Sequence, residues 1–224
     1  MAAALIHEIL PVGLLQCNCS VVGDPATREA IVIDPGDEVD RILEVIGRHG
    51  LKVKAIVNTH AHIDHVGGLS KMQQQTGAPV LMHRDDLELY GHLDVQAAMI
   101  GMRAPVRTEV DGFLGEGERI HWGPFSAQVI HTPGHTQGSL CLYLPFEESP
   151  DGTSQKPWLF AGDTLFAGSI GRTDLWGGSF EQIMMSLQTK LMELPDEAIV
   201  YPGHGPATTI GRERGTNPFL TGRY

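Results

Sequence analysis

The stretch from Thr59 to Gly68, THAHIDHVGG, decides how this chain is interpreted, because it places four candidate metal ligands within six positions. It completes an apolar, β-branched run that starts at Val53 and predicts a buried strand with the ligands at its carboxyl end. Two positions apart on an extended chain, His60 and His62 can project to the same side. Asp64 and His65 follow, where two glycines turn the chain and a helical pattern begins. His60 and His62 can therefore bind one metal ion, and Asp64 and His65 can bind another.

Three further candidate ligands occur in similar surroundings downstream. His135 follows a strand pattern over 127–131, Asp163 closes the apolar run at 159–162, and His204 follows the run at 199–202. At each place the strand pattern ends in glycine, which lets the backbone turn tightly and approach a bound ion closely. A histidine-rich surface loop is the alternative interpretation of the first stretch. An isolated loop of that kind would not explain the recurrence, which predicts a metal site.

This set of motifs resembles the metallo-β-lactamase superfamily of hydrolases. Within it the chain is most similar to the glyoxalase II group, the hydroxyacylglutathione hydrolases, and to the short bacterial members that lack the C-terminal helical domain. The turn Val32-Ile33-Asp34-Pro35-Gly36 belongs to the resemblance. The longer motifs that carry it are THAHIDHVGG (59–68), GHTQGS (134–139), GDTLFAGSIGRTD (162–174) and PGHGPATTIGRERGTNPFL (202–220).

The resemblance implies a role for each candidate ligand. His60, His62 and His135 would hold a first metal ion, Asp64, His65 and His204 a second, and Asp163 would bridge both. Two divalent ions, two carboxylates and a bridging hydroxide leave about one positive charge to stabilise a developing oxyanion. Five imidazoles and two carboxylates suit zinc, with iron or manganese as the other possibilities. Asp34 either orients a ligand imidazole through its second ring nitrogen or simply forms the Asp-Pro-Gly turn.

The activity implied is the hydrolysis of a thioester, S-acylglutathione above all, by metal-bound hydroxide. Asp64 and Asp163 would be the catalytic carboxylates, with Asp64 available to shuttle a proton. Arg172 stands where the family places a basic residue for the glutathione tail, and its alternative role is an ion pair with Asp174. Three positions differ from the family's pattern for binding glutathione: Asp174 stands in place of an aromatic residue, Gly205 in place of a glutamate and Pro206 in place of a tyrosine. These differences weaken the case for glutathione as the thiol and leave the reaction class unchanged.

Three other functions stay open at this point. One is an oxidoreductase that resembles the persulfide dioxygenases, which share the His-x-His-x-Asp-His block but use a single iron. Another is a binding or regulatory module with a vestigial site, although all seven ligand positions are filled. Lactonase or β-lactamase activity is a third, and the segments GSIGR and NPFL favour the glyoxalase-like group over it.

Composition excludes several classes of partner. The formal net charge of -11, with only 16 lysines and arginines among 224 residues and no basic cluster, argues against nucleic acid. No uncharged apolar segment of 18 residues occurs, which argues against a membrane span.

The chain has three cysteines, Cys17, Cys19 and Cys141. An odd number disfavours a set of disulfides, so we expect reduced, structural thiols. Without a signal-peptide pattern at the start, the expected location is the cytoplasm, and the expected partner is a small-molecule thioester.

The pattern of elements predicts an α/β (α+β) fold in one domain over residues 1–224. Strands are expected at 5–10, 20–22, 30–33, 53–59, 80–82, 119–121, 127–130, 140–144, 158–160 and 198–201. Helices are expected at 37–49, 69–75 and 180–194, with two short ones within 85–103. The segment Pro145–Pro157 predicts a surface hairpin loop. The family resemblance sharpens the fold to a four-layer αββα sandwich with the metals at one edge.

Overall fold

The computed structural model describes residues 5–146 and 155–223, and these form two compact units. The first unit comprises residues 5–114 and 121–125. The second comprises residues 115–120 and 126–223, without 147–154. Within these described residues, two six-stranded sheets and one two-stranded sheet supply the framework.

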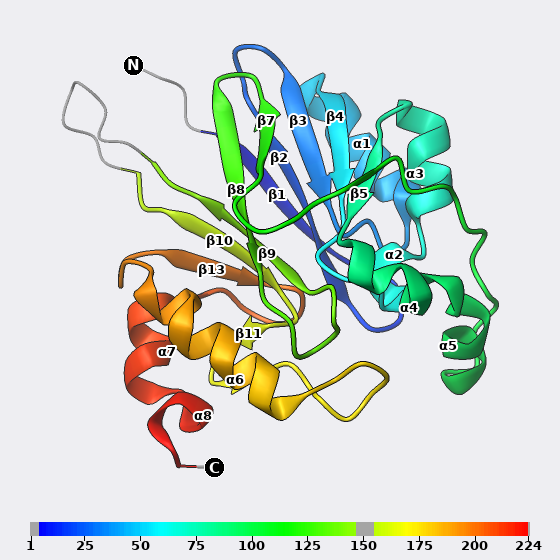
Figure 1. The fold of residues 1–224 in the computed structure, drawn as a ribbon. Coiled ribbons are helices and arrows are strands. Elements are labelled where there is room, and N and C mark those ends of the chain that lie inside the picture. Colours follow the sequence, from blue (N-terminus) through cyan, green and yellow to red (C-terminus); the bar gives the residue numbers. More distant parts are fainter. Residues whose placement is uncertain (1–4, 147–154, 224) are drawn as a thin grey trace. The chain divides into compact units, whose positions relative to one another are not determined.

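The first sheet has the strand order β1-β2-β3-β4-β5-β6 (Figure 1). The first three strands pair antiparallel, and β3 to β6 pair parallel. Because parallel neighbours end at the same edge of a sheet, Asp34 after β3 and His60 after β4 belong to one edge. The strands are β1 (Ile6–Val12), β2 (Cys17–Gly23), β3 (Glu29–Ile33), β4 (Lys52–Val57), β5 (Val80–Met82) and β6 (Gly112–Phe113).

Helices α1 (Val39–His49) and α3 (Leu69–Thr76) lie against this sheet (Figure 1). Helix α1 buries Val39, Ile42, Val45 and Ile46, which repeat at helical spacing, and these side chains join the core of the first unit. It ends at His49, as predicted, and Gly50 follows in a left-handed conformation. The remaining helical segments of the unit are α2 (Ile63–Val66), η1 (Arg84–Asp86), α4 (Leu87–Gly91) and α5 (Leu93–Met99).

The second sheet has the order β14-β13-β10-β9-β8-β7 (Figure 1). Because β10 runs parallel to β13 and antiparallel to β9, which is antiparallel to β8, the strands β8, β10 and β13 all end at one edge. The strands are β7 (Arg119–Trp122), β8 (Phe125–His131), β9 (Leu140–Leu144), β10 (Trp158–Gly162), β13 (Ile199–Pro202) and β14 (Thr208–Thr209). A small hairpin pairs β11 (Leu165–Phe166) with β12 (Ser169–Ile170).

Helices of the second unit pack on this sheet through a separate apolar core. Leu159 and Val200 of the sheet belong to one buried cluster with Ile183 and Leu187 of α6 and Ile210 of α7. The helical segments are α6 (Phe180–Thr189), η2 (Leu191–Glu193), α7 (Ile210–Thr216) and α8 (Pro218–Thr221).

The expected strands and the helices at 37–49 and 69–75 are confirmed to within a few residues, and so are two short helices within 85–103. The expected helix over 180–194 is wrong beyond Thr189. Lys190 leaves the helical conformation, and its ammonium donates to the backbone oxygen of His131 while Leu191 turns into the core. Of the expected loop at 145–157, residues 147–154 lie outside the described residues.

Among the residues that the structure describes, no helix combines the length and the apolar character needed to cross a bilayer.

Candidate metal centre

Four candidate ligands of the first unit lie in the loop after β4 and in helix α2. His60 and His65 are buried, with their ring centroids 4.0 Å apart. The ring of His62 stands at 88° to that of His60, at a centroid distance of 4.9 Å. Asp64 Oδ2 lies 3.7 Å from His65 Nε2. The passage from strand to loop to helix, predicted from the sequence, thus gathers imidazoles and a carboxylate in one small volume.

Asp34 fixes the orientation of one of these imidazoles. Its buried carboxylate accepts hydrogen bonds from Thr59 N at 2.7 Å and Thr59 Oγ1 at 2.6 Å, and it lies 3.0 Å from His65 Nδ1. Because a carboxylate only accepts, His65 donates from Nδ1, which leaves Nε2 as its ligand atom. Asp34 also has a φ of 52°, and its carbonyl oxygen accepts from Gly36 N. Asp34 therefore does both things considered for it: it forms the turn, and it orients the imidazole of His65, a candidate ligand.

Thr59 extends this network to a second imidazole. Its single hydroxyl proton goes to Asp34, so its oxygen accepts from His60 Nδ1, 3.1 Å away. Nε2 of His60 is thereby left as the ligand atom. One buried carboxylate therefore sets the tautomer of two imidazoles, one directly and one through a hydroxyl group.

Two side chains that the sequence analysis missed hold the backbone of the ligand loop. Asp86 of η1 accepts from Ala61 N at 2.8 Å. Gln96 of α5 accepts from Ile63 N at 2.9 Å and donates from Nε2 to Ala61 O at 3.2 Å. These bonds satisfy the peptide groups on both sides of His62 and restrict its position. No local pattern marks either residue, because both lie some 25 to 35 positions from the loop that they hold.

The turn after β3 and the ligand loop approach each other backbone to backbone. A Cβ atom at Gly36 would lie 1.5 Å from Asp64 O, and one at Gly68 would lie 2.3 Å from Pro35 O. Gly68 N donates to Pro35 O at 3.1 Å. Only glycine permits this approach. The Asp-Pro-Gly turn and the Gly-Gly pair of the sequence therefore contact each other in the fold.

Cys17 is a further neighbour of the ligand loop, with its sulfur 3.5 Å from His65 Nδ1. Burial raises the pKa of this thiol to about 12. Its sulfur meets Nδ1 of His65, the atom that Asp34 engages, and not the Nε2 that is left for an ion. The expectation of free cysteines is confirmed for all three, each of which is buried.

The second unit carries the other three candidate ligands at the ends of its strands. Asp163 follows β10, and its Oδ2 lies 3.6 Å from His135 Nε2 and 3.7 Å from His204 Nε2. His135 Nδ1 lies 2.8 Å from the carbonyl oxygen of Arg172. Because a carbonyl only accepts, His135 also presents Nε2 as its ligand atom. Gly171 allows this arrangement, since a Cβ there would lie 1.8 Å from Asp163 O.

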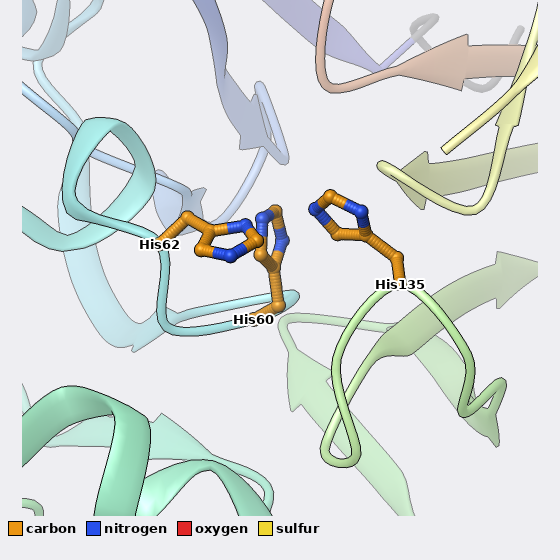
Figure 2. Close-up of side chains that lie close together, drawn as sticks. All are labelled: His60, His62 and His135. Atoms are coloured by element: carbon orange, nitrogen blue, oxygen red, sulfur yellow. The ribbon is translucent and has the colours of Figure 1, made fainter. Parts of the chain in front are cut away.

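The candidate ligands form clusters of a size that suits a metal ion. The ligand atoms of His60, His62 and His135, which Figure 2 shows, lie within 4.8 Å of one another. The same limit holds for two further groups: His60, His65 and Asp163, and Asp64, His65 and His204. The donors are imidazole nitrogens and carboxylate oxygens, without a thiolate, and they fit divalent zinc, iron or manganese. These His/Asp clusters are typical of a dinuclear centre of the metallo-β-lactamase type.

Arg172 is the residue predicted to hold substrate. It is exposed and forms a bidentate pair with Asp174, with Nε 2.8 Å from Oδ1 and Nη2 2.9 Å from Oδ2. This pair lowers the pKa of Asp174 to about 2. The ion pair with Asp174, the alternative role considered for Arg172, is thus present in the structure. The role of Arg172 in binding substrate stays a prediction.

The chain matches the model of the metallo-beta-lactamase superfamily over residues 12–204 and belongs to this superfamily. The predicted fold class is confirmed: two mixed sheets flanked by helices form the metallo-β-lactamase fold. The His/Asp clusters are those of a metallo-hydrolase of this superfamily.

Particular relatives narrow the group. The chain is 37% identical over 223 residues to the hydroxyacylglutathione hydrolase GloC of Haemophilus influenzae, covering 96% of this chain and 98% of that protein. The crystal structure of the BLEG-1 B3 metallo-beta-lactamase matches with a TM-score of 0.85 and 34% identity, over 96% of this chain and all of that one. The crystal structure of TTHA1623 in a di-iron-bound form matches with a TM-score of 0.80 and 38% identity, over 95% of this chain and all of that one. Other relatives of similar identity have no named activity. The predicted likeness to short glyoxalase II proteins is confirmed.

Proposed function

We propose that this protein is a dinuclear metal-dependent hydrolase of thioesters, with S-acylglutathione as the substrate class. The observation that carries the proposal is the clustering of five imidazoles and two carboxylates, without a thiolate, in groups whose ligand atoms lie within 4.8 Å. The name of the GloC relative supports the thioester, because that protein is a hydroxyacylglutathione hydrolase at 37% identity over nearly the whole chain.

His60, His62 and His135 would hold one ion, Asp64, His65 and His204 the other, and Asp163 would contribute to both. A pair of divalent cations supplies a nucleophile from water near neutral pH and polarises the carbonyl that is attacked. The carboxylates of Asp64 and Asp163 offset two of the four positive charges, so the centre keeps a net positive charge to stabilise an oxyanion.

The chain itself pre-organises this centre. Asp34, Thr59 and the carbonyl of Arg172 each engage an Nδ1 atom, so His65, His60 and His135 all present Nε2. Fixing the tautomer in advance removes an ordering cost from ion binding. Asp64 lines a small cavity of the first unit, where a carboxylate can take up or release a proton as the thiol departs. A thiolate is a good leaving group, so the reaction needs no strong general acid.

Arg172 would hold a carboxylate of the thiol. Its guanidinium is exposed and can exchange the carboxylate of Asp174 for one of the substrate, because an ion pair exposed to water contributes little stability. The exchange leaves the backbone carbonyl of Arg172 on His135 undisturbed.

The test is a hydrolysis screen on protein freed of metal and then loaded with zinc, iron or manganese. Acetyl thioesters of glutathione, coenzyme A and N-acetylcysteamine are compared, with release of thiol as the readout. We expect metal-dependent turnover with glutathione preferred, and loss of both turnover and bound metal in His62→Ala and Asp163→Ala. The control is His121→Ala, which changes an exposed histidine of β7. Metal-loaded protein that hydrolyses none of the three thioesters would refute the proposal.

A further inference from the structure

A small cavity of the first unit adjoins one candidate metal ligand. It has a volume of about 160 Å³ and lies between the β1–β2 turn, the Gly36–Asp37 turn, helix α2 and the segment after α5. Asp64 is part of its wall, so a group bound in the cavity would lie next to the proposed reaction centre. Its other wall residues include Leu14, Leu15, Ile63 and Met102.

Three apolar side chains of the wall are exposed. Leu14, Leu15 and Met102 have exposed fractions of 70%, 45% and 36%. Among the described residues, six of the eleven large apolar side chains that are exposed come from just two segments, 14–15 and 99–106. Single exposed apolar residues need no explanation, but a group of them around a hollow marks a binding surface.

The β1–β2 turn is held in place before any ligand arrives. Gly13 N donates to Glu38 Oε2 at 3.1 Å, and Gln16 Nε2 donates to Gly13 O at 2.7 Å. Arg41 of α1 donates to both Glu38 Oε2 and Pro11 O. These bonds tie the turn to the start of α1, so Leu14 and Leu15 stand on a fixed support, and binding costs little ordering of the backbone.

Charge decides which part of a substrate suits the cavity. Its wall contains the carboxylates of Asp37 and Asp64 and one guanidinium, that of Arg103. With Asp64 assigned to a metal ion, Asp37 and Arg103 leave the rest of the wall without net charge, so it does not favour an anion such as the carboxylates of glutathione. An uncharged apolar group needs no charged partner there. A cavity of about 150 Å³ with an apolar lining holds benzene, which gives the scale of the group that fits.

We propose that this cavity receives an apolar group of the substrate, about the size of a six-carbon chain or a phenyl ring, beside the thioester carbonyl. The proposal rests on the proposed thioester hydrolysis and narrows its substrate class from small hydroxyacyl groups to larger apolar ones. The group belongs to the acyl part or to the thiol part of the thioester, and two substrate series tell these apart.

The kinetic test measures kcat/KM for both series on metal-loaded protein. In one series the thiol is N-acetylcysteamine and the acyl chain grows from two to ten carbons. In the other the acyl group is acetyl and the thiol grows from ethanethiol to octanethiol. We expect kcat/KM to rise about twofold to fourfold per methylene in one series and to level off near six carbons, since each methylene buried in a half-open cavity gains part of its transfer free energy.

Two methionines of the same segment provide the matched variants. Met102 lines the cavity, whereas Met99 is 71% exposed and is not part of its wall. Met102→Glu should abolish the dependence on chain length, and Met99→Glu should retain it. A flat response in both series, or equal effects of the two variants, would overturn the proposal.

A second readout does not depend on turnover. Hexan-1-ol or benzyl alcohol is titrated into the protein while the methyl resonances of its methionines are followed by NMR. We expect saturable shifts of the Met102 methyl group, with the Met99 methyl group unchanged. If no thioester is hydrolysed but the Met102 signal responds in this way, the proposed function fails and the cavity assignment stands. If neither alcohol shifts the Met102 signal, the cavity assignment fails.

Discussion

The replacement Asp34→Asn tests whether one buried carboxylate orients the imidazoles of the ligand loop. Asp34 meets three donors: Thr59 N, Thr59 Oγ1 and His65 Nδ1, at 2.7, 2.6 and 3.0 Å. Asparagine keeps the shape but offers one acceptor oxygen and one amide that donates. If its oxygen accepts from Thr59 N, its amide group faces His65 Nδ1. His65 must then shift its proton to Nε2, which removes the lone pair meant for an ion.

The size of the effect follows from these contacts. Loss of a partner that orients a ligand imidazole costs about 10- to 100-fold in metal affinity, which equals about 1.4–2.8 kcal/mol. Asp34 is 2% exposed, so water cannot replace the lost acceptor. The same carboxylate also acts on His60 through Thr59, and we therefore expect an effect near the upper end, about 100-fold.

The assay is a competition titration of zinc between the protein and a chromophoric chelator. The control is Asp40→Asn, which removes an exposed carboxylate of α1 that pairs with Lys71. Circular dichroism checks that both variants stay folded. A zinc affinity of Asp34→Asn within threefold of the unchanged protein would show that Asp34 does not set the tautomer of His65, because that role cannot be lost without cost.

Three further predictions concern the support of the ligand loop, the pH dependence of stability and the binding of substrate. Gln96→Leu should weaken zinc binding about tenfold in the same titration, because it removes the bonds to Ile63 N and Ala61 O that hold the ligand loop; unchanged affinity would show that α5 does not position the loop. Burial lowers the pKa of His7 from 6.5 to about 4, so between these values the unfolded chain binds a proton that the folded chain does not. The contribution of His7 to stability should fall by about 2 kcal/mol from pH 7 to pH 5, and His7→Gln should remove this loss in urea unfolding of the metal-free protein; equal slopes with pH for both proteins would contradict the assignment. Arg172→Ala should raise KM for a glutathione thioester about tenfold with less effect on kcat, as expected when a group binds ground state and transition state alike; an unaltered KM would remove Arg172 from the substrate site.

The part of the site nearest to the ligands could be predicted from the sequence, because strand ends, glycines and histidines are local signals. The turn at Asp34 to Gly36 and the pair Gly67 and Gly68 occur at recognisable places in the pattern. Their mutual contact, in which Gly36 leaves no room for a Cβ atom beside Asp64 O, depends on the fold and has no local signature.

Supports from distant elements could not be predicted. Asp86 and Gln96 look like ordinary polar residues of short helical segments, although their side chains hold the ligand loop. Glu213 shows the same difficulty at the other end of the chain. It reads as a solvated residue of a glycine-rich polar stretch, yet it is fully buried, and Gly168 N and Asn217 Nδ2 donate to its Oε2 at 2.8 and 2.9 Å. Helices α7 and α8 were missed because Glu213 and Asn217, two polar residues, take buried positions there, so no apolar repeat marks these segments.

Whether the protein is a dinuclear thioester hydrolase is measured by the rate of acetylglutathione hydrolysis as zinc is added stepwise to metal-free protein. We expect a rate that rises until two equivalents of zinc are bound per chain and then levels off, with no oxygen consumed. Full activity at one equivalent, activity without metal, or one iron per chain together with oxygen uptake on glutathione persulfide would contradict it.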